Sequence, residues 1–326
     1  MMSPLPLKNL KVGELHLKNN RRPRFKRAAD VEVQITERDR DILKLVADYR
    51  FLHNEHLQLL TNTSLKPLQR RLYKLYHNHY LDRPKVQLYT WERGNGTKKI
   101  VYALGNKGAD ILVGDGIPRG RIDWAKKNAD IKHAFLEHTL GISDFRAAMT
   151  AAALQQGFTN SKWIKGNDAG VSISWKDENY SEVRIPLVPD GFFTLENSDY
   201  KMHFFLEYDT GSMPVARRDY QQTSIKRKIE AYFNLWREDK LYRKNKTSHP
   251  SILSKAFGVS SFRVLFVTTT IERIENMLML CRSLPTAQEL FCFTTKNSFN
   301  LLNPKRLLEP IWVTAKKVEL QSLLED

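Results

Sequence analysis

Apolar residues recur at helical spacing through the segment from 36 to 76 and predict three short helices. The first begins after Thr36, a favourable N-cap residue that is followed three residues later by Asp39. The second covers 53–60, and the third covers 66–76, after the polar turn TNTS. The apolar positions expected to face inward in the first and third helices are Ile42, Leu43, Leu45, Val46, Leu68, Leu72 and Leu75.

Two strand-like segments follow the third helix. Residues 86–91 and 100–104 are separated by the glycine-containing turn RGNGTKK, which predicts a β-hairpin. Three helices and a two-stranded wing make a winged helix-turn-helix, in which the third helix would contact DNA. Its candidate DNA-facing side chains are Gln69, Arg70, Arg71 and Lys74. The same pattern also fits a winged helix that binds protein and carries a solvated basic face.

The second half alternates between helices and short strands, which predicts an α/β (α+β) domain with a mixed central sheet. The apolar run FRVLFVTTT at 262–270 reads as a buried strand of that sheet. The helices expected around the sheet are 131–156, 217–238 and 271–282, and a further strand is expected at 290–295. The expected parts of the chain are a basic arm at 1–30, the winged helix at 31–115, a linker at 116–130 and the second domain at 131–326.

The stretch PDGFFTLENSDYKMHFFLEYD, at 189–209, reads as two apolar strands around a turn, with acids inside the apolar runs. If Ser198 and Asp199 form the turn, antiparallel pairing places Glu196 opposite Lys201, and Phe192 opposite Phe205. The same register places Asp190 opposite Glu207. Period-two alternation then puts Asp209 on the face of Glu207. The sequence thus predicts that three carboxylates converge at one end of a hairpin.

Converging carboxylates repel one another and lose hydration when they are partly buried. A divalent cation removes that cost, and hard oxygen ligands suit Mg²⁺ or Mn²⁺. The alternative is that these acids pair with lysine or arginine at a strand end. In the helix that follows, Lys228 and Tyr232 are four residues apart and share a face. Lys228 could therefore meet the carboxylates and either orient or activate a water or stabilise charge on a phosphate, although Lys226 competes for that role.

Charge indicates the partner. The 326 residues include 52 Lys and Arg against 36 acids, a net charge of +16, with a pI near 9.7, which favours a polyanion. No apolar run could span a bilayer, and no signal-peptide core begins the chain, so we expect a cytoplasmic protein that binds double-stranded DNA and no membrane. The two cysteines, which lack CxxC spacing, also suit a reducing compartment. The basic arm, with Arg21, Arg22 and Arg24, either follows phosphates or is a plain disordered tail.

Several familiar motifs are absent or misleading. There is no GxxxxGK[ST] loop and no GxSxG elbow, so neither a P-loop motor nor a serine hydrolase is indicated. The run HNEH at 53–56 is not HExxH and gives no support to metalloprotease chemistry. The run YHNHY at 76–80 suggests an HNH nuclease or a tyrosine relaxase, but we interpret it as the end of the third helix.

The motif PD at 189–190 and EYD at 207–209, within this order of elements, resembles the PD-(D/E)xK nuclease core of restriction endonucleases. In that family an Asp and a Glu hold Mg²⁺ and a Lys assists the attacking water, which implies these roles for Asp190 and Glu207. Asp209 stands where the lysine is expected. In some relatives the lysine lies on the following helix, where Lys228 could serve. Glu137 resembles an additional helix-borne acid of some members.

A wider set of segments, VYALGNKGADIL, HAFLEHTL, PDGFF, FFLEYDTGS, KRKIEAY and LLNPKRLLEPIW, resembles the replication-relaxation family of plasmids and mobile elements, over about 35–312. The resemblance implies plasmid DNA relaxation, replication or mobilisation in conjugation. The related MobC-type relaxases are thought to nick an origin of transfer with this nuclease fold. We expect a Mg²⁺- or Mn²⁺-dependent nickase, with accessory mobilisation or replication proteins or a second copy as partners. The alternative is a non-catalytic DNA-binding accessory or repressor with a degenerate nuclease fold.

Overall fold

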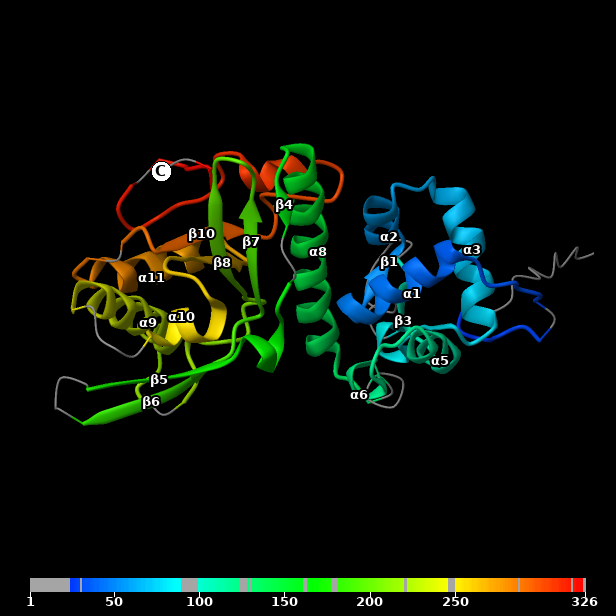
Figure 1. Cartoon of the computed structure of the whole chain (residues 1–326), viewed down its shortest axis with the longest axis horizontal. Helices are drawn as coiled ribbons and strands as arrows, with labels where there is room; N and C mark the ends of the chain where they lie inside the picture. Colours follow the sequence, from blue (N-terminus) through cyan, green and yellow to red (C-terminus); the bar gives the residue numbers. More distant parts are fainter. Residues whose placement is uncertain are drawn as a thin grey trace, which may run out of the picture.

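The computed structural model shows a mixed α/β protein with three sheets among the residues it describes (Figure 1). The sheets have the strand orders β1-β3-β2, β10-β9-β8-β7-β4 and β5-β6. The described residues are 24–29, 31–88, 99–122, 128, 130–160, 163–176, 181–219, 222–245, 250–286, 288–317 and 319–324.

The three helices predicted in the N-terminal part are present. Helix α1 begins at the expected cap, where Asp39 accepts hydrogen bonds from the backbone N–H and the hydroxyl of Thr36, each at 2.7 Å. The apolar faces of these helices meet in one core, in which Ile42 and Leu72 are fully buried. The elements of this part are α1 (Glu37–Tyr49), β1 (Leu52–His53), α2 (Asn54–Thr61), α3 (Leu65–His77), β2 (Leu81–Asp82) and β3 (Val101–Leu104).

The predicted hairpin at 86–91 and 100–104 is wrong in its first strand. Lys85–Gln87 form a 3₁₀ helix, η1, and β3 pairs with β1 and β2 instead. The side chain of Gln87 explains the difference. It accepts from the backbone N–H of Val101 at 2.9 Å and donates to the Val101 carbonyl at 3.1 Å, as a partner strand would. Residues 89–98, which include the predicted turn, lie outside the described part of the chain.

Helix α8 (His133–Gln155) lies between the N-terminal part and the large sheet (Figure 1). It joins both sides because small residues line its faces: Ala147 packs in the N-terminal core, and Ala148 packs in a core of the sheet. The Ser143 hydroxyl also donates to the Phe51 carbonyl at 2.9 Å. Helices α5 (Asn106–Gly114) and α6 (Arg119–Ile122) precede α8, and α6 falls within the segment expected to be a linker.

The predicted mixed sheet is confirmed. Strands β8, β9 and β10 are parallel, whereas β7 is antiparallel to β8 and to β4. The predicted hairpin register is also confirmed, because Glu196 pairs with Lys201 and Phe192 pairs with Phe205. The strands are β4 (Thr159–Asn160), β7 (Gly191–Glu196), β8 (Lys201–Tyr208), β9 (Arg263–Thr268) and β10 (Phe291–Thr295).

Period-two alternation sends neighbouring residues of the sheet into two separate cores. Phe205 packs in the core that includes residues of α9 and α11, whereas Phe204 and Leu206 pack in the core that includes residues of α8. The two-stranded sheet packs its apolar face, which includes Ile173, into the α9 core. The remaining elements are β5 (Val171–Lys176), β6 (Glu182–Leu187), α9 (Ile225–Asn245), α10 (Ile252–Phe257), α11 (Ile271–Arg282) and the 3₁₀ helices η2 (Gly166–Ala169) and η3 (Pro304–Leu308).

Candidate cation-binding pocket

A small pocket of about 70 Å³ lies at the end of the β7–β8 hairpin. The two strands bring Asp190 and Glu207 to its wall, and Asp209 follows directly after β8. Side chains from α8 and α9 complete the wall. The lining residues are His138, Asp190, Glu207, Tyr208, Asp209, Thr210, Ser212, Met213, Ile225, Lys228 and Phe266.

Glu207 is the most enclosed acid of the pocket, with 3% of its surface exposed. Lys228 donates a hydrogen bond to its Oε2, and the Tyr232 hydroxyl donates to its Oε1 at 2.7 Å. Both donors come from α9, where the four-residue spacing places them on one face. Burial raises the pKa of Glu207, and the nearby Asp190 carboxylate raises it further, while Lys228 opposes the shift. A cation beside these two acids would relieve their repulsion.

Asp190 precedes β7 and is fixed by the neighbouring strand and by α8. The backbone N–H of Tyr208 donates to its Oδ2 at 2.7 Å, and the His138 Nε2 lies 3.3 Å from the same oxygen. Burial alone lowers the pKa of His138, but the hydrogen bond and charge of Asp190 outweigh it, so the net pKa is raised. Sequence reasoning favoured Glu137 on this helix. Glu137 is exposed, and its Oε2 lies 3.4 Å from Nδ1 of His133. The residue of α8 that lines the pocket is His138.

Asp209 lines the pocket, but its carboxylate is already hydrogen-bonded to residues that do not line it. Its Oδ2 accepts from the Thr268 hydroxyl at 2.6 Å and from Arg273 Nε at 2.8 Å. Its Oδ1 accepts from the backbone N–H of Gly211 at 3.0 Å. Arg273 also donates to the Met213 carbonyl at 2.8 Å, so Asp209 ties the segment after β8 to α11. Sequence reasoning missed Arg273, which lies 64 residues from Asp209 and carries no local signal.

The carboxylates that line this pocket are groups that could hold a hard cation. Asp190 and Glu207 present carboxylate oxygens, the ligands that Mg²⁺ and Mn²⁺ prefer. Lys228, whose net pKa is raised because Glu207 and Asp190 outweigh the effect of burial, supplies the positive charge of the pocket. Lys226, the competing candidate, lies on the more exposed side of α9, 3.8 Å from Glu230.

A second group of candidate metal ligands joins α2 to α8. His53, His56 and Asp144 offer three ligand atoms within 4.8 Å of one another, so they could hold a metal ion. His56 Nδ1 accepts the backbone N–H of His53 at 3.2 Å, which places the ring proton on Nε2, 2.7 Å from Asp144 Oδ1. An ion at this position would therefore have to displace that proton. The HNEH run in the sequence contains the two histidines, but only the fold shows that Asp144 lies beside them.

The predicted DNA-facing residues divide into two kinds. Gln69, Arg70 and Lys74 are exposed on α3. Arg71 instead forms an ion pair with the buried Asp39 of α1, and both Asp39 oxygens accept from it. Arg24 lies among the described residues and is exposed, whereas Arg21 and Arg22 lie outside them. The exposed Tyr73, on the same helix as Lys74, was missed because an aromatic residue in a helix usually indicates core.

The structure is a mixed α/β protein with a carboxylate-lined pocket beside the large sheet and an N-terminal helical part that exposes basic residues. The Replication-relaxation family model matches residues 43–252, well over half of the chain, and the chain belongs to this family. The match includes α3, Asp190, Glu207 and Lys228, and ends before Arg273. No curated protein and no solved structure matches the chain. Among the described helices, none combines the length and apolar character needed to cross a bilayer.

Proposed function

We propose that this protein nicks plasmid or mobile-element DNA at an origin of transfer or replication, with Mg²⁺ or Mn²⁺ as its cofactor. The observation that carries the proposal is the meeting of Asp190, Glu207 and Lys228 in one pocket, from two strands and a helix. Two acids and a lysine on a β-hairpin and the next helix are the elements of a PD-(D/E)xK site. Membership of the Replication-relaxation family supports the same function.

Each residue of the pocket has a distinct part in this proposal. Asp190 and Glu207 would hold the cation, which polarises the phosphodiester and lowers the pKa of an attacking water. His138 lies next to Oδ2 of Asp190, and Tyr232 donates a hydrogen bond to Oε1 of Glu207, so these two residues hold the carboxylates in position. When a cation neutralises the negative charge of Glu207, Lys228 would be released to stabilise negative charge on the scissile phosphate. Asp209, held by Arg273 and Thr268, assists by anchoring the end of β8.

The DNA would be bound by the N-terminal part. Its order α1-β1-α2-α3-β2-β3 supports a winged helix-turn-helix, with α3 as the recognition helix. Gln69, Arg70 and Lys74, which are exposed on this helix, would contact double-stranded DNA. Accessory mobilisation or replication proteins, or a second copy of the chain, would bring the nicking site to the bound origin.

One observation favours a second candidate function. The position where PD-(D/E)xK nucleases carry their lysine is Asp209, and this residue forms an ion pair with Arg273. If Lys228 serves only to neutralise the buried Glu207, the pocket is structural. The protein would then be a non-catalytic DNA-binding accessory or repressor.

Supercoiled plasmid carrying the element's own origin provides the test. Wild type with Mg²⁺ or Mn²⁺ is expected to convert it to open circles, and Asp190→Ala is expected to leave it supercoiled. Glu137→Ala removes an exposed acid outside the pocket and serves as the matched control, with activity close to wild type. Supercoils that stay intact with wild type, together with a clear gel shift, would support the accessory function instead.

A further inference from the structure

Residues 24–29 and 31–35, which we name the N-terminal strap, lie against α3 and are hydrogen-bonded to side chains of that helix and of its C-cap residue, Asn78. His77 Nδ1 accepts the backbone N–H of Ala28 at 2.7 Å. Asn78 Nδ2 donates to the Val31 carbonyl at 2.5 Å, and Arg71 Nη2 donates to the Gln34 carbonyl. The strap therefore follows α3 over two helical turns.

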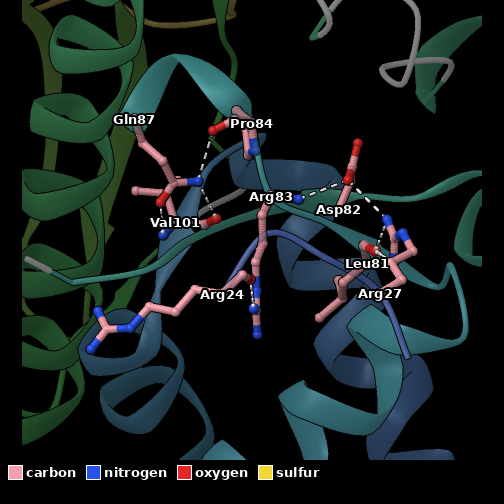
Figure 2. Close-up of polar contacts among 8 residues, drawn as sticks. All are labelled: Arg24, Arg27, Leu81, Asp82, Arg83, Pro84, Gln87 and Val101. Carbon is pink, nitrogen blue, oxygen red and sulfur yellow. Dashed lines mark hydrogen bonds and ion pairs between the residues drawn. The ribbon is translucent and has the colours of Figure 1, made fainter. Parts of the chain in front are cut away.

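The beginning of the strap is held by two arginines near β2 (Figure 2). Arg27 donates to the Leu81 carbonyl at 3.3 Å and to Asp82 Oδ1 at 2.9 Å. The buried Arg83 donates to the Arg24 carbonyl, and its guanidinium lies 3.8 Å from the centre of the Tyr76 ring. Arg27 also lies over that ring, at 4.2 Å. Arg83 thus fixes the backbone of Arg24 near β2.

The strap borders the exposed face of α3. The strap is bound on one side of α3 by Arg71 and, at the C-terminal end of the helix, by the C-cap residue Asn78. Arg70 and Lys74 occupy the adjacent side and are exposed. The exposed side chains of the strap itself include Arg24 and Lys26, with Glu32 as an opposing charge.

We propose that the strap and α3 form one composite surface for double-stranded DNA. Arg24 and Lys26 would contact backbone phosphates beside the groove entered by α3. This inference rests on the proposed DNA-binding function and extends it to a second, sequence-independent contact. Because the hydrogen bonds to α3 already hold the strap, these contacts form with little further loss of chain entropy.

The salt dependence of duplex binding tests the strap directly. Each phosphate contact contributes about 0.9 to the slope of log K against log salt concentration. Arg24→Ala with Lys26→Ala in the full chain should therefore reduce the slope by about 1.8. The control is Lys255→Ala with Lys305→Ala, which removes the same charge from exposed positions of the C-terminal part and should leave the slope near that of wild type.

The two hypotheses fail in different ways. If wild type shows no salt-dependent duplex binding, the proposed function fails and the strap proposal falls with it. If Arg70→Ala with Lys74→Ala reduces the slope and the strap pair does not, only the strap proposal is overturned. An equal reduction of the slope by the strap pair and by the C-terminal control pair would likewise overturn the strap proposal alone.

Cleavage from a tethered iron chelate provides a positional test. The native cysteines Cys281 and Cys292 are buried, so a chelate attached to Lys26→Cys or Lys74→Cys labels one chosen site. Both chelates should cut the same duplex within about one helical turn, or 10 base pairs, of each other. Cuts from position 74 without cuts from position 26 would contradict the composite surface.

Discussion

Lys228 on α9 donates a hydrogen bond to Glu207 on β8, although the two residues are 21 positions apart in the chain. Tyr232, one helical turn further on, donates to the other oxygen of the same carboxylate. Glu207 thus has both oxygens bound by one helix face, at the end of a strand whose other inward residues are apolar.

Removing the lysine should destabilise the protein. Lys228→Met leaves Glu207 buried without its cationic partner, which typically costs roughly 3 kcal/mol or more. Lys226→Met is the matched control on the same helix and should change the free energy of unfolding by less than about 0.5 kcal/mol. Urea denaturation measures both. The double variant Lys228→Met with Glu207→Gln should recover part of the loss, and no recovery would argue against the pair as the cause.

Magnesium binding should depend on the pocket and not on the histidine group. Mg²⁺ prefers oxygen ligands, so calorimetry should show binding to wild type and its loss in Asp190→Asn. His56→Gln disrupts the group that joins α2 to α8 and should leave Mg²⁺ binding intact. If His56→Gln abolishes binding while Asp190→Asn retains it, the cation belongs at His53, His56 and Asp144.

Asp209 should act as an anchor. Asp209→Asn removes the negative charge that faces Arg273 and weakens the contacts to Thr268, so unfolding should become easier by about 2–3 kcal/mol. Its Mg²⁺ affinity should stay within a few-fold of wild type because Asp190 and Glu207 remain. A loss of affinity as large as that of Asp190→Asn would instead identify Asp209 as a cation ligand.

The histidine group should make stability depend on pH in the mildly acidic range. Burial lowers the pKa of His56 below 6.5, so the folded state binds fewer protons there than the unfolded state. Stability contributed by neutral His56 is present above pH 6.5 and decreases as pH falls below it, by at most about 1.4 kcal/mol per pH unit. His138, whose pKa is raised, contributes with the opposite sign. The difference between wild type and His56→Gln therefore isolates this effect, and parallel curves from pH 7.5 to 5.5 would refute it.

Gly191, next to Asp190, should not tolerate a side chain. A Cβ at this position would lie 2.0 Å from the Trp163 ring, so Gly191→Ala must move the ring or β7. Overpacking of this kind typically costs about 1–3 kcal/mol, and the displaced strand should also weaken Mg²⁺ binding at Asp190. Gly114→Ala is the control, because among the described residues no atom beyond its chain neighbours and its own helix backbone lies within 4 Å of the added Cβ. Thermal unfolding with and without Mg²⁺ compares the two variants.

Local patterns predicted the parts of this protein that depend on neighbours in the chain. Apolar residues at helical spacing, such as Ile42 in α1 and Leu72 in α3, predicted these two helices. The placement of one turn between two apolar strands predicted the register that pairs Phe192 with Phe205. The four-residue spacing of Lys228 and Tyr232 placed both on the face that reaches Glu207. These features follow from helix and strand periods, which the order of residues alone determines.

Tertiary structure decided which side chains meet across long separations. It brings Asp209 into contact with Arg273, 64 positions away, and Asp144 into contact with His56, 88 positions away. It also let Gln87 bind Val101 where a strand was expected. Such contacts depend on how whole elements pack, and no period in the sequence encodes them. The sequence by itself determined the helices, the β7–β8 hairpin and its acids, while packing decided that Asp209, which also lines the pocket, is anchored by Arg273.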